Sequence, residues 1–424
     1  MLNKILGTVG TRYLVAGLNL ILIFINAKTL GLEGVGLAGL IVASANIAMV
    51  VNGIFAGNTI VYFMNQYSVR QLIVPAYIWS FVGGLLACTI MLIFGMLPKG
   101  WFLEIYLLSV VMSLVNVNAR FLLGKDRITN FNLTFFIQGG LLLFVLLYIY
   151  FVLKKNSVDA YVAGMFFTNI AALIVSLLMI INYLRGEKEE TDWVSMLRKM
   201  FSYGLWGSSD NVAEILTTRL NYFLVQHFTG LAGVGLLDAG TKISESVWHI
   251  SRSVSFIEYE QVARAEERAQ KQITLRLLKL TFFTIAFATF IILLIPEKVY
   301  TDFLFSPQFQ GMRQVIIFLA LGIIALGTNS LLSSFFTGTG RIKISAFSSF
   351  IGLITLLIAG YIIVPRLGVK GAAISCSIAY CCMLVFSIIM FCKETRSNFK
   401  ELIPNNDDRE KMKELIHRFF AHFS

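Results

Sequence analysis

The sequence predicts an all-α integral membrane protein in which twelve transmembrane helices form two pseudo-twofold-related six-helix bundles around a central cavity. Hydrophobic residues make up 57% of the 424 positions, charged residues only 14%, and the mean hydropathy is +0.76. A soluble protein of this length needs more polar surface. The chain divides into twelve apolar runs of about 20 residues, the length that spans a bilayer. We place these runs at 5–27, 36–60, 72–97, 101–123, 131–153, 160–184, 201–228, 231–256, 274–296, 313–338, 342–364 and 370–392.

An internal repeat predicts that the two bundles are homologous. The segments Gly-Leu-Glu-Gly-Val-Gly-Leu at 31–37 and Gly-Leu-Ala-Gly-Val-Gly-Leu at 230–236 each follow one apolar run and open the next. Pro98 and Pro296, at nearly the same offset in the two halves, each end a later run. Many transporters hold their substrate between two such halves. We therefore expect an N-terminal lobe at 1–184, a cytoplasmic amphipathic linker at 185–200, a C-terminal lobe at 201–392 and a cytoplasmic amphipathic tail at 393–424.

The linker and the tail each carry apolar residues at helical spacing. In the linker region these residues are Trp193, Met196, Leu197, Met200 and Phe201. In the tail they are Met412, Leu415, Ile416, Phe419 and Phe420. A helix with one apolar face and basic neighbours suits the surface of the inner leaflet. For the tail, binding of a partner protein is the alternative.

The distribution of Lys and Arg predicts that both termini are cytoplasmic. With that orientation, 23 of the 35 basic residues lie on the inner side and 8 on the outer side, and an excess of Lys and Arg marks the cytoplasmic side. The first run contains Arg12 and lacks a small-residue cleavage site, so we expect no cleaved signal peptide. The net charge of +11 indicates anchoring at the inner leaflet. The sequence contains no nucleic-acid-binding module.

The sequence does not indicate an enzyme. The five cysteines all lie in predicted spans, and neither a Cys-x-x-Cys pair nor a Cys/His metal spacing occurs. The outer loops are short, and nowhere do a nucleophile, a base and an orienting group come together. We expect no metal, no cofactor and no catalytic residue.

A stripe of ionisable residues in the run at 231–256 is the strongest functional signal. At about 100° per residue, one face of this helix carries Asp238, Lys242, Glu245, His249 and Arg252. A charge at the bilayer centre costs on the order of 2.5–3.5 kcal/mol even on lenient insertion scales, so the stripe must face protein or water. The first run repeats the pattern more weakly with Arg12, Asn19 and Asn26. Together these faces predict a wet internal cavity.

The preceding run, at 201–228, supplies acids that face this stripe. If the two helices are antiparallel across a turn near Gly230, Asp210 lies level with His249 and Arg252. A structural ion pair between Asp210 and Arg252 is one interpretation, because buried charges usually find partners. Arg219, nine residues past Asp210, points to the opposite side of an ideal helix.

The second interpretation concerns two carboxylates, Glu214 and Glu245, which the same register places at one depth. Two carboxylates in a low-dielectric site repel, so one should hold its proton more tightly, or the two could share a cation. The candidates for binding a coupling ion are Asp210, Glu214, Asp238, Glu245 and His249.

Three turns of the chain resemble those of bacterial polysaccharide flippases. The first is Asn-Ala-Lys-Thr-Leu-Gly-Leu-Glu-Gly-Val-Gly-Leu at 26–37, which is similar to a first-loop signature of a basic residue, Leu-Gly and a glycine-rich entry into the second span. The second is Leu-Asp-Ala-Gly-Thr-Lys-Ile at 237–243, and the third is Val-Pro-Arg-Leu-Gly-Val-Lys-Gly-Ala-Ala-Ile at 364–374. Over nearly its whole length the chain therefore resembles the Wzx-type O-antigen flippases of the multidrug/oligosaccharidyl-lipid/polysaccharide (MOP) exporter superfamily.

This resemblance implies an alternating-access transporter that moves a polyprenyl-pyrophosphate-linked oligosaccharide across the bacterial cytoplasmic membrane during polysaccharide biosynthesis. It implies substrate-binding cations, for which this sequence offers Arg12, Lys28, Arg219, Lys242 and Arg252. Membrane lipids, a coupling H⁺ or Na⁺ and a polysaccharide polymerase are the implied partners. Two alternatives stay open: a cation-coupled multidrug exporter of the same superfamily, and a non-transporting membrane protein of envelope assembly.

Overall fold

The computed structural model describes residues 2–185 and 192–402, and within these ranges it contains helices and no strand. The helices are α1 (Leu2–Val51), η1 (Asn52–Ile54), α2 (Gly57–Phe63), α3 (Val69–Ile93), α4 (Phe102–Gly124), α5 (Ile128–Phe135), η2 (Phe136–Gly140), α6 (Leu141–Leu147), η3 (Tyr148–Val152), α7 (Val158–Ile180), η4 (Ile181–Arg185), α8 (Trp193–Arg264), α9 (Glu267–Leu294), η5 (Val299–Leu304), η6 (Pro307–Phe309), α10 (Met312–Gly338), α11 (Ile342–Thr395) and η7 (Phe399–Leu402).

Three of these helices are long because each contains two membrane-crossing limbs joined at a glycine. The bends are at Gly31 in α1, Gly230 in α8 and Gly368 in α11, with φ of 69°, 77° and 58°. Positive φ is readily adopted only by glycine. Gly31 and Gly230 open the two copies of the repeat, and their ψ values of −176° and −173° are also nearly the same. The two sequence copies therefore form the same bend.

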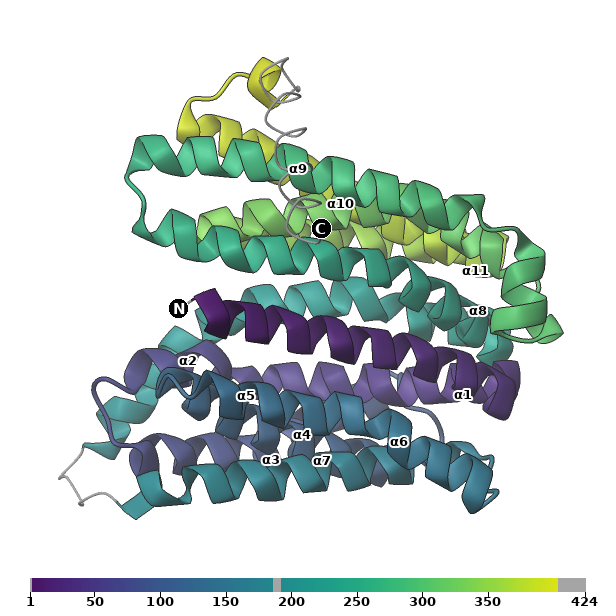
Figure 1. Ribbon diagram of the computed structural model, residues 1–424, viewed down its shortest axis with the longest axis horizontal. Coiled ribbons are helices and arrows are strands. Elements are labelled where there is room, and N and C mark those ends of the chain that lie inside the picture. The colour runs from purple at the N-terminus through teal and green to yellow at the C-terminus, as the bar shows by residue number, and fades with distance from the viewer. Residues whose placement is uncertain (1, 186–191, 403–424) are drawn as a thin grey trace.

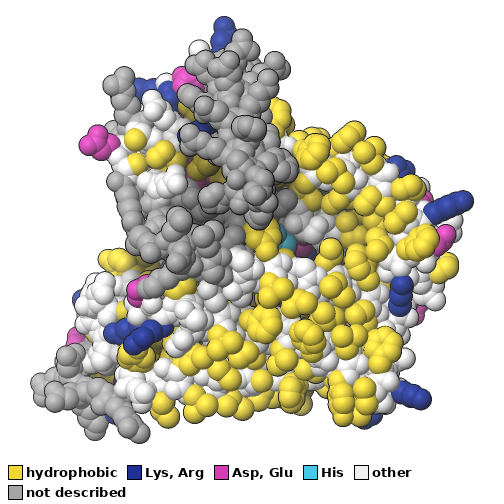
Figure 2. Space-filling view, in the orientation of Figure 1, with side chains coloured by type: hydrophobic (Ala, Val, Ile, Leu, Met, Phe, Trp, Pro, Cys, Tyr) yellow, Lys and Arg dark blue, Asp and Glu magenta, His cyan; other side chains and the backbone are white. Residues whose placement is uncertain are grey.

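Counting the limbs confirms the twelve-helix fold over the described residues. Eight helical stretches are long and apolar enough to cross a membrane, and two of them, Tyr13–Phe63 and Ile342–Thr395, contain two limbs each. α8 is not among the eight because its charged residues lower its hydropathy, yet it also has two limbs. Hydrophobic side chains cover a broad band on the face of the molecule shown in Figure 2, as expected of a multi-pass membrane protein in contact with lipid.

The two six-helix lobes meet along α1 and α8. In Figure 1, α3–α7 lie on one side of the molecule and α9–α11 on the other, with α1 and α8 between them. We call the end that carries Gly31, Gly230 and Gly368 the bend side. The opposite end, where the α8–α9 and α10–α11 turns lie, is the linker side. The lobes contact each other at both ends.

On the bend side the two lobes touch backbone to backbone. A Cβ atom added at Gly36 would lie 2.1 Å from the carbonyl oxygen of Leu231, and one added at Gly235 would lie 2.0 Å from the carbonyl oxygen of Leu32. The contact is reciprocal because these positions are equivalent in the repeat. Glycine at both positions therefore permits the close crossing of α1 and α8.

The loop between α9 and α10 adds a second contact on the bend side. The Oε1 atom of Gln308 accepts a 3.0 Å hydrogen bond from the backbone N–H of Leu32. Lys28 donates a 2.7 Å hydrogen bond from Nζ to the carbonyl oxygen of Phe303. Lys28, predicted to bind substrate, thus joins the two lobes at the bend side in this state.

On the linker side, α2 of the first lobe packs against the start of α8. The rings of Tyr62 and Tyr203 stack with centroids 4.3 Å apart. A Cβ atom added at Gly204 would lie only 1.7 Å from the carbonyl oxygen of Ile54. Close backbone packing thus holds the lobes together at this end as well.

Residues 193–200 of the predicted linker are part of α8, which begins at Trp193 and continues without a break into its first limb. Met196 and Met200 are fully buried in an apolar cluster with Ile180 of the first lobe. Residues 186–191 and 403–424, which include the apolar face expected in the tail, lie outside the described residues. The domain boundaries at 184, 200 and 392 remain predictions.

An ion pair attaches η7 to α9, and it predicts a pH response. Lys271 Nζ lies 2.8 Å from Glu401 Oε2, and this hydrogen bond, aided by the backbone N–H of Asn398, lowers the pKa of Glu401 below its ordinary value. The stabilisation is therefore present above the ordinary pKa and is lost as the pH falls through the lowered pKa. Lys271→Gln should raise the pKa of Glu401, measured by carbon NMR of labelled glutamate, whereas Lys400→Gln should not. An unchanged pKa in Lys271→Gln would contradict this assignment.

Candidate functional site

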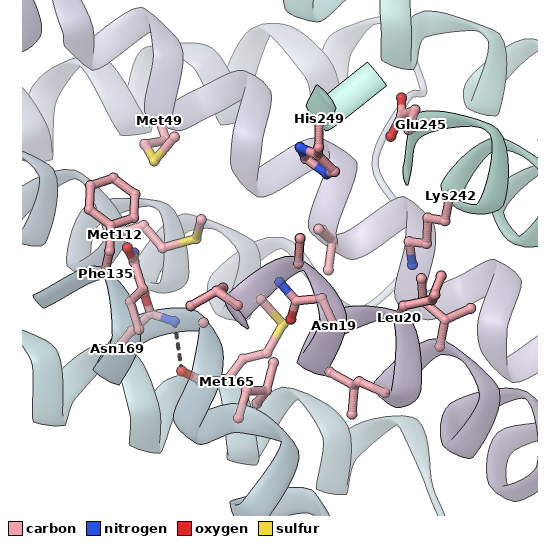
Figure 3. A pocket seen from close by; sticks show the side chains of 18 of the residues that line it. Asn19, Leu20, Met49, Met112, Phe135, Met165, Asn169, Lys242, Glu245 and His249 are labelled. Carbon is pink, nitrogen blue, oxygen red and sulfur yellow. Dashed lines mark hydrogen bonds between the residues drawn. The ribbon is translucent and has the colours of Figure 1, made fainter. Parts of the chain in front are cut away.

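A cavity of about 460 Å³ lies between the lobes, bounded by α1, α4, α7, α8 and the segment from α5 to α6 (Figure 3). Its two walls differ in chemistry. The wall from the first lobe carries neutral carboxamides: Asn19, Asn26, Asn116, Gln138 and Asn169. The wall from the second lobe carries ionisable side chains, all on α8: Arg219, Lys242, Glu245 and His249. Much of the remaining lining is apolar and includes the thioethers of Met49, Met112 and Met165.

Hydrogen bonds fix the orientation of several of the amides. Gln138 donates from Nε2 to Oδ1 of Asn169 at 2.9 Å, and Asn169 donates from Nδ2 to the carbonyl oxygen of Met165 at 2.8 Å. The hydroxyl of Tyr150 donates to Oδ1 of Asn26 at 3.1 Å. Gln138 lies in η2, a π-helical turn, and such turns are frequent at functional sites. The first lobe thus presents fixed neutral donors and acceptors.

A continuous polar network underlies the charged wall. Arg219 Nη2 lies 2.9 Å from Glu245 Oε2, and Lys242 Nζ lies 2.7 Å from Asp238 Oδ2. Tyr222 joins the two pairs, because its hydroxyl accepts from Arg219 Nη1 and donates to Asp238 Oδ1, both at 3.2 Å. Two acids and two bases give the network a formal charge of zero. The wall is therefore strongly polar but balanced.

The expected ion pair between Asp210 and Arg252 is wrong. Arg252 Nη2 instead lies 3.0 Å from Glu214 Oε1. The carboxylate of Asp210 accepts hydrogen bonds from the hydroxyls of Ser345 and Ser349 on α11. The expectation came from aligning only the two limbs of α8 with each other. A third helix, α11, supplies the partners of Asp210.

Glu214 and Glu245, which we expected at one depth, each have an arginine partner of their own. The expectation that Arg219 points away from Asp210 is consistent with the structure. Asp210 faces α11, and Arg219, about 180° around the helix, lines the cavity. Arg252 packs with its guanidinium carbon 4.1 Å from the ring centroid of Trp248.

The ten residues predicted to form the site are therefore dispersed. Four line the cavity: Arg219, Lys242, Glu245 and His249. Asp238 lies behind the wall, and Glu214, Arg252 and Asp210 do not line the cavity. Lys28 lies on the bend side, and the side chain of Arg12 lies outside the described residues.

Sequence reasoning missed Gln138, Asn169 and Tyr222. Gln138 and Asn169 each lie inside a run that is otherwise almost wholly apolar, and this isolation is a signal that could have identified them. Tyr222 is 2% exposed and completes the network between the two ion pairs. Its sequence context gives no comparable signal.

The sequence matches no family model. An uncharacterized membrane protein of Methanocaldococcus jannaschii is 24% identical over 197 residues, which is 46% of this chain and 39% of that protein. The match thus spans less than half the length of this archaeal relative. By itself this similarity supports a related membrane protein and no particular activity.

Solved structures place the fold among those of MOP superfamily transporters. An inward-facing multidrug resistance MATE family transporter superimposes with a TM-score of 0.69 at 16% identity, covering 89% of this chain and 94% of that one. The inward closed conformation of the lipid II flippase MurJ gives a TM-score of 0.67 at 13% identity, covering 95% and 89%. At these identities the likeness concerns the fold alone. It confirms the expected two-lobed, twelve-helix architecture.

Proposed function

We propose that this protein is an alternating-access flippase for a polyprenyl-pyrophosphate-linked oligosaccharide. The observation that carries the proposal is that one cavity between the lobes pairs an amide wall with a charged wall that presents Arg219 and Lys242. Carboxamides offer both donors and acceptors, which suits the hydroxyls of a sugar. Guanidinium and ammonium groups suit the oxygens of a pyrophosphate.

In this proposal the two walls orient the headgroup, because one presents amides and the other presents charged groups. The pyrophosphate lies against Arg219 and Lys242, and the first sugars lie against the amides. The polyprenyl chain stays in the lipid. The cavity volume falls in the range of about 300–1,000 Å³ typical of small-ligand sites, so it accommodates the headgroup and the first sugars only.

Charge balance allows both capture and release of an anion. Each cation of the wall already holds a carboxylate, so an incoming phosphate oxygen must compete with Asp238 or Glu245. Binding is then weaker than to unpaired cations, and a transporter needs binding that is strong enough to load and weak enough to unload. Arg12, Lys28 and Arg252 are proposed as contacts along the path.

The cellular setting forms part of the same proposal. The membrane is the bacterial cytoplasmic membrane, the linker side is cytoplasmic and both termini are inside. A polysaccharide polymerase receives the flipped substrate, and an H⁺ or Na⁺ gradient drives the cycle through the carboxylates of α8.

A cation-coupled multidrug exporter is the second candidate, and one observation favours it. Glu245 lines the cavity, and its Oε1 atom is buried without a hydrogen-bond partner. Such an atom could attract an organic cation.

Neutralising one ion pair of the wall tests the proposal. The double variant Asp238→Asn/Lys242→Gln removes the Lys242 cation without stranding its partner. Loss of a charge-assisted hydrogen bond should lower flipping of a fluorescent polyprenyl-pyrophosphate disaccharide in proteoliposomes roughly 10- to 100-fold. Arg366→Gln, which removes an exposed cation on α11, should leave the rate unchanged.

The flippase and the multidrug exporter predict different results in transport assays. Unchanged flipping in the double variant would contradict the flippase proposal. Transport of ethidium that is abolished by Glu245→Gln, with no flipping in the wild type, would establish the exporter instead.

A further inference from the structure

A buried carboxyl group outside the cavity has no partner. Glu258, on the second limb of α8 toward the linker side, is 0% exposed, and neither of its carboxyl oxygens has a hydrogen-bond partner. It does not line the cavity. An ionised carboxylate without a partner in a low-dielectric interior costs several kcal/mol. A neutral carboxylic acid avoids this cost.

The surroundings of Glu258 are hydroxyls and apolar side chains. Thr274 of α9 is fully buried, and its hydroxyl lies beside the carboxyl group without forming a well-aligned hydrogen bond. Ser255, one helical turn before Glu258, is 6% exposed and its hydroxyl is also unpaired. One turn further along the two helices, Val262 and Leu278 belong to one apolar cluster. The seam between α8 and α9 therefore contains unsatisfied polar atoms enclosed by apolar side chains.

The described bases near this seam are engaged elsewhere or point away. α9 carries Lys271, which pairs with Glu401, Arg276, which is exposed, and Lys279, which has an interaction of its own. The charged residue of α10 is Arg313, on the bend side. On α8, Arg252 pairs with Glu214. At the linker end of α11, Arg341 pairs with Glu394, and Lys343 and Lys393 are exposed. The charged side chains that lie outside the described residues here are those of Glu260, Arg264, Glu267 and Arg268.

We propose that Glu258 is a proton-binding site whose proton is held in the closed state described here and released to water when the second limb of α8 moves away from α9 on the linker side. The step is the dissociation of a carboxylic acid into a carboxylate and a proton that passes to water. A proton fits better than a metal ion, because the carboxyl and two hydroxyls supply fewer oxygens than the six to eight that a hard cation such as Ca²⁺ takes.

The position of Glu258 on α8 couples it to the cavity. It lies thirteen residues beyond Glu245 on the same helical limb, which is about 20 Å along the axis. Because that limb also carries Asp238 and Lys242, a movement that exposes Glu258 also moves the charged wall. The inference rests on the proposed alternation between states and identifies its coupling ion as H⁺.

Infrared spectroscopy of the full chain in lipid nanodiscs tests the protonation directly. The spectrum should contain a carbonyl band of a protonated carboxylic acid that disappears in Glu258→Gln. Glutamine is nearly isosteric with the neutral acid, so the variant should fold, and thermal unfolding verifies this. Glu214→Gln removes an ion-paired carboxylate and should leave the band intact. A band that persists in Glu258→Gln would overturn the proposal.

A second measurement tests the link to conformation without any substrate. Spin labels at Tyr259→Cys on α8 and Gln272→Cys on α9, two exposed positions beside the seam, report the separation of the two helices in a cysteine-free background. In the wild type the distance should increase as the pH rises, because deprotonation favours exposure of Glu258. In Glu258→Gln it should stay short at every pH. The same pH response in both proteins would also overturn the proposal, and neither measurement depends on which substrate is transported.

Discussion

Replacing Gly36 and Gly235 together by Ala is expected to hold the lobes apart on the bend side and, under the proposed function, to abolish transport. The two new Cβ atoms would lie 2.1 Å and 2.0 Å from carbonyl oxygens of the opposite helix. Both contacts are with backbone, which cannot rotate away as a flexible side chain could. Small residues at a crossing are what allow two transmembrane helices to approach this closely. The variant therefore loses the closed state and, with it, one half of the proposed alternating cycle.

Disulfide formation across the bend side measures this effect. Cysteines at positions 32 and 308, whose native residues are joined by the 3.0 Å hydrogen bond, should cross-link in an otherwise cysteine-free protein. The yield should fall to background in the double alanine variant. Gly17→Ala and Gly207→Ala are matched controls, because a Cβ atom at either position meets nothing within 4 Å. Full cross-linking in the double variant would show that the crossing tolerates side chains.

An alanine at the other end of the interface should separate the lobes on the linker side and not on the bend side. Gly204→Ala on the linker side would place a Cβ atom 1.7 Å from the carbonyl oxygen of Ile54. It should separate the lobes there and leave the bend-side disulfide intact. Loss of that disulfide in Gly204→Ala would mean that the variant is misfolded and does not simply favour one state.

The fold could be predicted because its causes are local in the sequence. Each span is a run of apolar residues of membrane length, and the bends at Gly31 and Gly230 follow from a repeated glycine-rich segment. Helix periodicity also identified the stripe that includes Lys242 and Glu245. These features depend on one helix at a time.

The partners of the charges could not be predicted because they depend on a third helix and on side-chain length. Asp210 is bound by hydroxyls of α11, more than 130 residues away in sequence, and nothing near Asp210 indicates this. Arginine reaches several ångströms from its helix, so Arg252 pairs with Glu214 instead. Glu258 lies just past the expected end of its span at 256, where a carboxylate is ordinarily solvated. It is nevertheless fully buried, with Thr274 of α9 beside it.

The ion pair between Arg219 and Glu245 should be costly to break from one side. Its side chains are 19% and 11% exposed, so Arg219→Gln leaves a mostly buried carboxylate without its charge partner. Breaking a buried pair in this way costs about 3–5 kcal/mol. The Arg341–Glu394 pair is the matched control, since its side chains are 33% and 29% exposed. Arg341→Gln should cost only about 0–1 kcal/mol.

A double-mutant cycle separates the attraction within the pair from the cost of burying each charge. Unfolding free energies measured in mixed micelles should show Arg219→Gln/Glu245→Gln to be more stable than the sum of the single changes predicts, because the double variant strands no charge. Tyr222 keeps its hydrogen bond to Asp238, so that end of the network remains in place. If Arg219→Gln were no more destabilising than Arg341→Gln, the Glu245 carboxyl would have to be neutral in this state. The wall would then carry a net positive charge and would bind the pyrophosphate without competition from Glu245.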